Sequence, residues 1–329
     1  MKRIILIMII IGMFVSAHVV TAGDTTPPAN PAMPQQEGSV VPGVVPTGVD
    51  FGIVGGYRYM RVTGSDVPVH AAPSERSRVL RRYEGGYDFV TPRGEAGDWT
   101  EINPGEWVQT RFLTEVYASY FTGAVIESEP NVPWGWVLVS HHASASPGGP
   151  EVLEDSYRVQ KYQMTNFFET AVVDGWRWYN IGDGRWVRQT MVSKVQRVAN
   201  PGLSGRWVAI DLYEQNLVAY EGDRMVFATL VASGRPGNDT NTGVFNIWAS
   251  NRMQVMDGER GGFGDYRLEN VPYAMYFDGD ISLHGTYWHN GFGYRQSRGC
   301  VNVTISDARW LYEWLPSDAG VYVYYSQSY

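Results

Sequence analysis

The chain carries an internal repeat, in which eight residues of one segment recur with the same identity 79 positions further on. In both copies, short runs that alternate apolar and polar residues are broken by glycine turns, which is typical of small antiparallel sheets. Because 329 residues exceed what one hydrophobic core organises, the repeat predicts two compact β modules within a chain of several domains. The matched positions are Tyr83, Phe89, Thr91, Trp99, Ile102, Gly105, Trp107 and Val108 in the first copy, and Tyr162, Phe168, Thr170, Trp178, Ile181, Gly184, Trp186 and Val187 in the second.

The Gly-x-Trp-Val ending of each copy resembles bacterial SH3-like domains, which in many exported proteins bind cell-wall peptides. The resemblance implies one SH3-like β-barrel over residues 51–118 and a second over residues 119–198. We interpret the tryptophans of the repeat as core residues, with an exposed ligand platform as the alternative.

The residues before the repeat have the composition of an export signal and a tether. Lys2 and Arg3 precede an apolar run, Ile4–Val15, and small residues follow, as in a secretory signal peptide over residues 1–23. A retained membrane anchor is the alternative, although the run is shorter than the roughly 20 residues that span a bilayer. Residues 24–50 are rich in Pro and Gly and predict an extended linker. We therefore expect a secreted, periplasmic or cell-wall protein that meets the membrane only through its transient signal.

Composition excludes several classes of function. The net charge is -8, with 26 basic and 34 acidic residues, which argues against a general nucleic-acid binder. Cys300 is the single cysteine, so no intramolecular disulfide can form. His70, His141 and His142 have no cysteine or acidic cluster at ligand spacing, and we expect no metal and no other cofactor.

A third domain is predicted over residues 203–326, where the pattern changes to longer apolar strands. Consecutive hairpins are followed by one convincing helix, from Ser306 as N-cap to Leu315, and Pro316 ends it. The predicted fold is therefore mainly β, with two small barrels followed by a β domain that has one short helix. The predicted strands are 207–212, 217–220, 225–231 and 244–248.

One cysteine and one histidine in this domain have the spacing of a nucleophile and its base. His284 ends an alternating strand, and Cys300 follows 16 residues later, so a single loop can return to place imidazole beside thiol. A thiol with a pKa near 8.5 needs a base or a cation nearby, which His284 and Arg298 would supply. Gly299 lets the backbone approach a substrate carbonyl, so its amide and that of Cys300 are candidates for an oxyanion hole. The alternative is a small buried cysteine without chemistry.

These residues also identify a family resemblance. The segment His284-Gly285-Thr286, followed by Ser297-x-Gly-Cys-Val-Asn302, resembles the signature of the YkuD-type L,D-transpeptidase catalytic domain. The resemblance extends from about Arg206 to Tyr324 and implies a β-sandwich. It includes Val208-Ala209-Ile210-Asp211-Leu212, Thr242-Gly243 and Val271-Pro272-Tyr273-Ala274-Met275-Tyr276-Phe277.

The resemblance implies acyl transfer on peptidoglycan stem peptides, as donor and as acceptor. Cys300 would attack the carbonyl of the third stem residue and expel D-alanine, His284 would carry the proton, and the Gly299 amide would stabilise the oxyanion. An amine from a second stem would then complete a 3→3 cross-link. Further candidates near the substrate are Arg298, Tyr273 and Thr286, together with Ser297 and Asn302, which are expected mainly to shape the turn.

Arg298 stands where the family usually has a second histidine. Arginine cannot accept a proton at neutral pH, so it can donate hydrogen bonds or pair with a substrate carboxylate but cannot act as a base. His289 in the preceding loop is a possible substitute, although we interpret it as a solvent-exposed loop residue.

Three other functions remain open from the sequence. An L,D-carboxypeptidase would use the same acyl-enzyme but release it to water. A wall-binding protein with a decayed catalytic site would fit Arg298, although the His284/Cys300 pair argues against it. A cytosolic cysteine hydrolase would conflict with the export signal.

Overall fold

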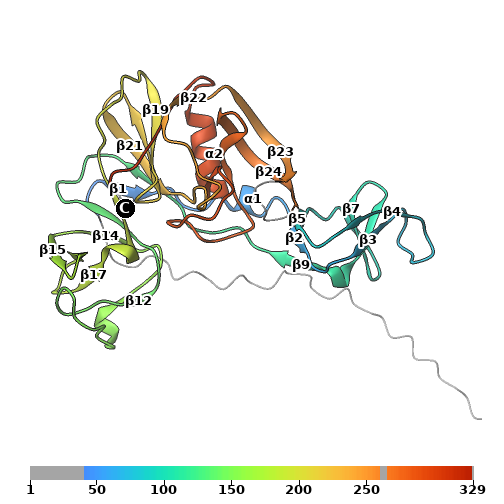
Figure 1. Ribbon diagram of the computed structural model, residues 1–329, viewed down its shortest axis with the longest axis horizontal. Coiled ribbons are helices and arrows are strands. Elements are labelled where there is room, and N and C mark those ends of the chain that lie inside the picture. The colour runs from blue at the N-terminus through green and yellow to red at the C-terminus, as the bar shows by residue number, and fades with distance from the viewer. Residues whose placement is uncertain (1–40, 260–264, 328–329) are drawn as a thin grey trace, which may run out of the picture. The chain divides into compact units, whose positions relative to one another are not determined.

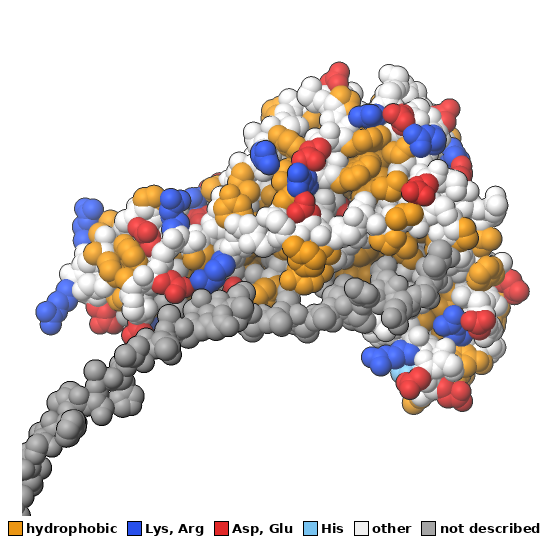
Figure 2. Space-filling view, turned by 180° about the vertical axis from the view of Figure 1, so that it is seen from behind, with side chains coloured by type: hydrophobic (Ala, Val, Ile, Leu, Met, Phe, Trp, Pro, Cys, Tyr) orange, Lys and Arg blue, Asp and Glu red, His pale blue; other side chains and the backbone are white. Residues whose placement is uncertain are grey.

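The protein is described by a computed structural model over residues 41–259 and 265–327. The predicted signal peptide and residues 24–40 of the predicted linker lie outside this range. Within it the fold is mainly β, as the sequence predicts, and the elements belong to one compact unit, Gly38–Tyr329 (Figure 1). On the face in Figure 2, basic and acidic side chains are interspersed, so positive charge does not gather into one patch there.

A seven-stranded sheet, here called sheet A, combines five strands of the C-terminal domain with two short strands from earlier in the chain. Its central strands read as continuous apolar runs because both of their faces are buried. One face packs against helix α2 and a second sheet, and the other packs against the second repeat module. In spatial order the strands are β1 (Val44–Pro46), β10 (Ala124–Ile126), β21 (Arg224–Leu230), β20 (Asn216–Glu221), β19 (Arg206–Asp211), β27 (Gly320–Tyr324) and β22 (Gly243–Asn246).

The second sheet, sheet B, runs from the C-terminal domain into the first repeat module. Strand β5 of the module pairs in parallel with β24, with Tyr87 opposite Tyr266, so one continuous sheet joins the two domains. The strands are β26 (Val301–Val303), β25 (Ile281–Gly285), β24 (Asp265–Asp278), β5 (Tyr87–Val90), β2 (Tyr59–Val62) and β9 (Leu113–Val116), while β23 (Ala249–Glu259) pairs with β24.

Helix α2 (Ile305–Trp314) lies beside β24 and β25 (Figure 1). It begins earlier than predicted: the N-cap is Thr304, whose hydroxyl accepts from the Asp307 amide at 3.3 Å, and Ser306 is already helical. Thr304 and not Ser306 caps the helix, because the extended backbone at Thr304 directs its hydroxyl toward the amides of the first turn. A four-residue helix, α1 (Phe51–Val54), was not predicted. Neither of these helices in the described range is long and apolar enough to cross a membrane.

Both repeat copies form small open sheets, and none closes into a barrel within the described residues. The repeat is visible in the backbone, because Gly105 and Gly184 turn with φ of +71° and +70° and Ile102 and Ile181 are both buried. The first copy has β4 (Val79–Tyr83), β3 (Val67–His70), β8 (Glu106–Gln109), β7 (Trp99–Asn103), β6 (Gly94–Ala96) and the 3₁₀ turn Thr110–Phe112. The second has β14 (Met164–Asn166), β11 (Trp134–Val137), β18 (Val192–Val195), β12 (His141–His142), β13 (Arg158–Val159), β15 (Glu169–Val173), β16 (Trp176–Asn180), β17 (Trp186–Arg188) and 3₁₀ turns at Asp155–Tyr157 and Gln189–Met191.

The structure differs from the predicted linker and from the interpretation of the tryptophans. Residues 44–46 pair with β10 at the edge of sheet A and so belong to the fold, not to a separate linker, because Val41 and Val44 are buried there. Among the repeat tryptophans Trp99 is buried, whereas Trp107, Trp178 and Trp186 are half-buried.

Candidate active site

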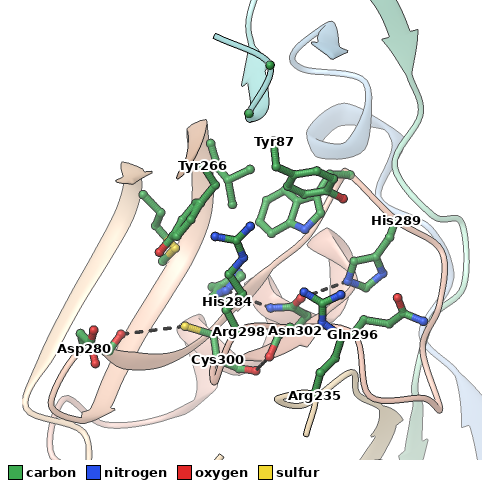
Figure 3. Close-up of a pocket in the computed structure, with 16 residues that line it drawn as sticks. Tyr87, Arg235, Tyr266, Asp280, His284, His289, Gln296, Arg298, Cys300 and Asn302 are labelled. Carbon is green, nitrogen blue, oxygen red and sulfur yellow. Dashed lines mark hydrogen bonds between the residues drawn. The ribbon is translucent and has the colours of Figure 1, made fainter. Parts of the chain in front are cut away.

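A cavity of about 430 Å³ lies at the end of β25, beside the turn that carries Cys300 (Figure 3). It brings together residues that are far apart in sequence, including a corner of the first repeat module. Its lining is formed by Gly85, Gly86, Tyr87, Arg235, Met256, Tyr266, Leu268, Asp280, His284, Trp288, His289, Gln296, Ser297, Arg298, Cys300 and Asn302.

The turn before Cys300 is held by side-chain hydrogen bonds to its backbone. The Ser297 hydroxyl accepts from the Gly299 amide at 3.1 Å and donates to the Cys300 carbonyl, and Thr240 donates to the Gly299 carbonyl at 2.7 Å. Gly299 has φ +119°, a conformation that strains residues with a side chain. Ser297 therefore shapes the turn, and the Gly299 amide must exchange its bond to Ser297 before it can bind a substrate oxygen.

The Cys300 thiol points toward polar atoms of the neighbouring strand. Its Sγ lies 3.8 Å from the hydroxyl of Ser282, which is fully buried on β25, and 3.9 Å from the carbonyl oxygen of Asp280. The Ser282 hydroxyl can donate to the sulfur when the thiol loses its proton. The sequence analysis missed this residue, although its place two positions before His284 on an alternating strand puts both on one face of the strand.

His284 is buried, and both of its ring nitrogens are hydrogen-bonded. Nδ1 lies 3.1 Å from the Gly285 carbonyl, which can only accept, so Nδ1 carries the proton. Nε2 lies 3.0 Å from the side-chain amide of Asn302. Burial lowers the pKa of His284 to about 4, so the ring is neutral at pH 7 and Nε2 is the nitrogen that can take a proton.

His289 belongs to the same hydrogen-bonded group, and its interpretation as a solvent-exposed loop residue is wrong. It is half-buried, it lines the cavity, and its Nε2 lies 3.0 Å from Asn302 Oδ1. The Gly291 amide donates to its Nδ1 at 3.2 Å. Burial lowers the pKa of His289 as well. Figure 3 shows the Asn302 side chain between the two imidazole rings.

Two guanidinium groups, Arg298 and Arg235, line the cavity. Arg298 lies 4.8 Å from the centre of the Tyr266 ring, in cation–π geometry. Burial raises the pKa of Tyr87, while the positive charges of Arg61, Arg235 and Arg298 act in the opposite direction. The cavity thus offers positive charge beside aromatic rings, a combination suited to an anionic group on an organic substrate.

Two predicted cleft residues lie elsewhere. Tyr273 is buried in the core against Tyr312, with ring centres 5.4 Å apart, and is not part of the cavity lining. Thr286 is fully buried, and its amide donates to the Val303 carbonyl at 3.0 Å. Tyr273 lies on β24 and Thr286 directly follows β25, and both side chains are buried outside the cavity lining.

The first repeat module packs against the loop that follows β25 and also lines the cavity. Tyr59 stacks on Tyr287 with ring centres 3.7 Å apart, and Phe89 lies 6.4 Å from Trp288. Trp288 in turn lies 5.7 Å from the His284 ring. No local signal in the sequence could have predicted these contacts, because they join segments about 200 residues apart.

Among the residues at 41–259 and 265–327, no group of three or more His, Cys, Asp and Glu side chains is placed to hold a metal ion. The side chains that line the cavity include a thiol, two imidazoles, two guanidinium groups, the Asp280 carboxyl and the hydroxyls of Ser297, Tyr87 and Tyr266.

The C-terminal domain is similar to a known family of catalytic domains. Residues 205–323 match the YkuD family model, described as the L,D-transpeptidase catalytic domain, which confirms the resemblance of that segment. No curated protein matches the chain.

Solved structures similar to this chain include three L,D-transpeptidase structures. A mutant of the Enterococcus faecium L,D-transpeptidase is 23% identical over 40% of this chain and 55% of its own, with a TM-score of 0.35. The L,D-transpeptidase from Stackebrandtia nassauensis is 28% identical over 39% and 58%, with a TM-score of 0.30. The catalytic domain of the E. faecium enzyme acylated by ertapenem is 23% identical over 37% and 98%, with a TM-score of 0.34. The chain spans under two thirds of the length of the first two.

Proposed function

We propose that this chain, whose residues 205–323 match the L,D-transpeptidase catalytic domain, is a cysteine acyltransferase that cross-links peptidoglycan stem peptides outside the cytoplasm. One observation carries the proposal: Cys300 and the neutral, buried His284 line the same cavity, together with Arg298. The export signal predicted over residues 1–23 supports the location.

The first step is attack of the Cys300 sulfur on the carbonyl carbon of the third stem residue. The thiol proton passes to His284 Nε2, since Nδ1 already carries one, and Nε2 exchanges its Asn302 contact to receive it. Ser282 donates toward the sulfur as its negative charge develops. The C–N bond to D-alanine then breaks, and His284 returns its proton to the leaving amine.

The oxyanion of this step is assigned to backbone amides of the Cys300 turn. The Gly299 amide is held at 3.1 Å from Ser297 Oγ, so the substrate oxygen replaces that hydroxyl as its acceptor. The thioester that results is resolved by the side-chain amine of a second stem peptide, after His284 removes a proton from that amine. The product joins the third residues of two stems and regenerates the thiol.

Two further functions use the same cavity. An L,D-carboxypeptidase would resolve the thioester with water, and a wall-binding protein with a decayed site would not form it. The cavity is bordered by Gly85, Gly86 and Tyr87 of the first module, which narrows the space for solvent around the acyl group and favours transfer to a bound amine.

The test uses full-length protein, disaccharide-tetrapeptide and mass spectrometry, with Cys300→Ala as the matched control. A cross-linked dimer that has lost one D-alanine, absent with the control, supports transpeptidation with Arg298 in place of histidine. A tripeptide without dimer assigns the carboxypeptidase reaction instead. An unchanged substrate, together with a thiol that does not react with iodoacetamide, overturns the enzyme assignment in favour of a wall-binding protein.

A further inference from the structure

The structure holds a hydrogen-bonded chain of three side chains that the proposed reaction does not use as such. It runs from His289 through the Asn302 amide to His284, with 3.0 Å at each contact. All three residues line the cavity, and they come from the loop after β25, from β26 and from β25 itself. A side-chain amide between two imidazoles links their tautomers, because its oxygen only accepts and its nitrogen only donates.

Backbone groups at the two ends of the chain independently require the same orientation of the amide. At one end the Gly291 amide donates to His289 Nδ1 at 3.2 Å, so the His289 proton is on Nε2 and Asn302 must present its oxygen there. At the other end the Gly285 carbonyl accepts from His284 Nδ1 at 3.1 Å, so Nε2 is bare and Asn302 must present its NH₂ group there. A flipped amide would break both contacts.

We propose, on the basis of the function proposed above, that His289 is a positioning residue for His284: acting through Asn302, it keeps the basic nitrogen of His284 unprotonated and oriented in the resting enzyme. Without His289 the amide is free to turn its oxygen toward His284 Nε2. That contact stabilises the imidazolium and ties its proton to Asn302, away from the sulfur.

The charged and titratable groups around the chain lie on two sides of it. Cys300, Arg235, Arg298, Asp280, Tyr87 and Tyr266 line the cavity together with His284 and His289. On the other side Lys161, from the second module, donates to the Asn290 carbonyl at 2.5 Å and opposes protonation of His289. Burial favours the neutral form of both rings, and the charge of Lys161 adds to this effect at His289, in agreement with the tautomers that the backbone requires.

The test is the titration of His284 in full-length protein labelled with ¹⁵N-histidine, followed by long-range imidazole spectra. At neutral pH the wild type is expected to show a proton on Nδ1 of His284 and on Nε2 of His289. In His289→Ala the titration midpoint of His284 is expected to rise by about one pH unit, the equivalent of one hydrogen bond exchanged at Nε2. In His289→Gln it is expected to stay near the wild-type value, because the glutamine Nε2 can donate to Asn302 in the same place. Signals of His70, His141 and His142 report whether the variants fold.

Kinetics and a double-mutant cycle separate positioning from packing. His289→Ala is expected to lower kcat for stem peptide about tenfold and to leave KM unchanged, and His289→Gln is expected to restore kcat. In a protein that already carries Asn302→Ala, His289→Ala is expected to have no further effect on the titration midpoint of His284. An unchanged midpoint in His289→Ala, additive effects in the cycle, or a wild-type His284 with its proton on Nε2 each overturn the inference. If no variant turns over stem peptide, the proposed function fails, while the titration still decides the role of His289.

Discussion

Replacing Glu214 with glutamine is expected to remove a loss of stability that the wild-type protein suffers as the pH rises. Glu214 is 6% exposed in the turn between β19 and β20, where its carboxylate accepts from the Lys194 amide of the second module at 2.7 Å. Burial raises the pKa of Glu214 from 4.5 to about 7, and the charge of Asp211 adds to the rise, while the Lys194 amide opposes it. The folded protein therefore holds a proton that the unfolded chain has already released.

The direction and the size of the change in unfolding free energy with pH follow from proton linkage. Because the folded-state pKa is raised, the stabilising contribution of protonation is fully present below pH 4.5 and is lost as the pH rises through about 7. At about 1.4 kcal/mol for each tenfold change in proton affinity, the full loss is about 3 kcal/mol, of which about 2.5 kcal/mol falls between pH 5 and pH 8. Glutamine keeps an acceptor for the Lys194 amide and does not titrate. Relative to wild type, Glu214→Gln should gain that amount of stability over this interval.

The measurement is the free energy of unfolding from urea titrations at pH 5, 6.5 and 8, for the wild type and the variant. Glu154→Gln, at an exposed glutamate of the second module, is the matched control and should leave the pH dependence of the wild type unchanged. If Glu214→Gln and the wild type lose stability in parallel from pH 5 to pH 8, the buried carboxyl is not the source of the effect and the reasoning is refuted.

Three further predictions follow from the cavity and the helix cap. Tyr87→Ala should raise KM for the donor peptide about tenfold while the reaction of Cys300 with iodoacetamide keeps its rate, because Tyr87 lines the cavity in which the peptide would bind; equal losses in both assays would contradict this. A carbapenem should add its mass to the intact protein by opening its strained lactam on Cys300, and a mass shift that persists in Cys300→Ala would refute that site. Thr304→Ala should lower the unfolding free energy by about 1 kcal/mol, measured in urea, since Thr304 is the N-cap of α2; an unchanged free energy would contradict this.

The placement of Cys300 and His284 in one cavity was predictable because both residues lie in short motifs. A glycine-flanked cysteine that returns one loop after a strand-ending histidine leaves few geometries open, and the structure places both in one cavity. The strands of the C-terminal domain were predictable for a similar reason, because apolar runs such as Val208–Leu212 are long enough to be recognised as strands from the sequence. The helix was predicted, but its first residue was displaced, since Thr304 and Ser306 are equally good caps by composition and the backbone conformation decides between them.

The partners of the site were not predictable in the same way. Tyr87 lies about 200 residues from Cys300 in sequence, and no periodicity indicates that β5 of the first module pairs in parallel with β24. His289 was misread because exposure of a loop histidine depends on what packs around it. Ser282 could have been inferred from alternation, but the contact with sulfur depends on the distance between two strands.

By itself, the sequence determined the mainly β class, the 79-residue repeat and the apolar strands of the C-terminal domain. It also identified Cys300 and His284 as the candidate thiol and imidazole. These properties depend on residue type and on spacing over a few residues, which strand alternation, turn chemistry and acid–base chemistry govern locally. The tertiary structure alone decided that a repeat module borders the cavity, that the Asn302 side chain contacts two histidines, and that burial keeps His284 neutral. Those properties depend on which segments, distant in sequence, pack together and exclude water. The direction of a buried hydrogen bond and the pKa of a buried group are set by that packing and cannot be derived from position in the chain.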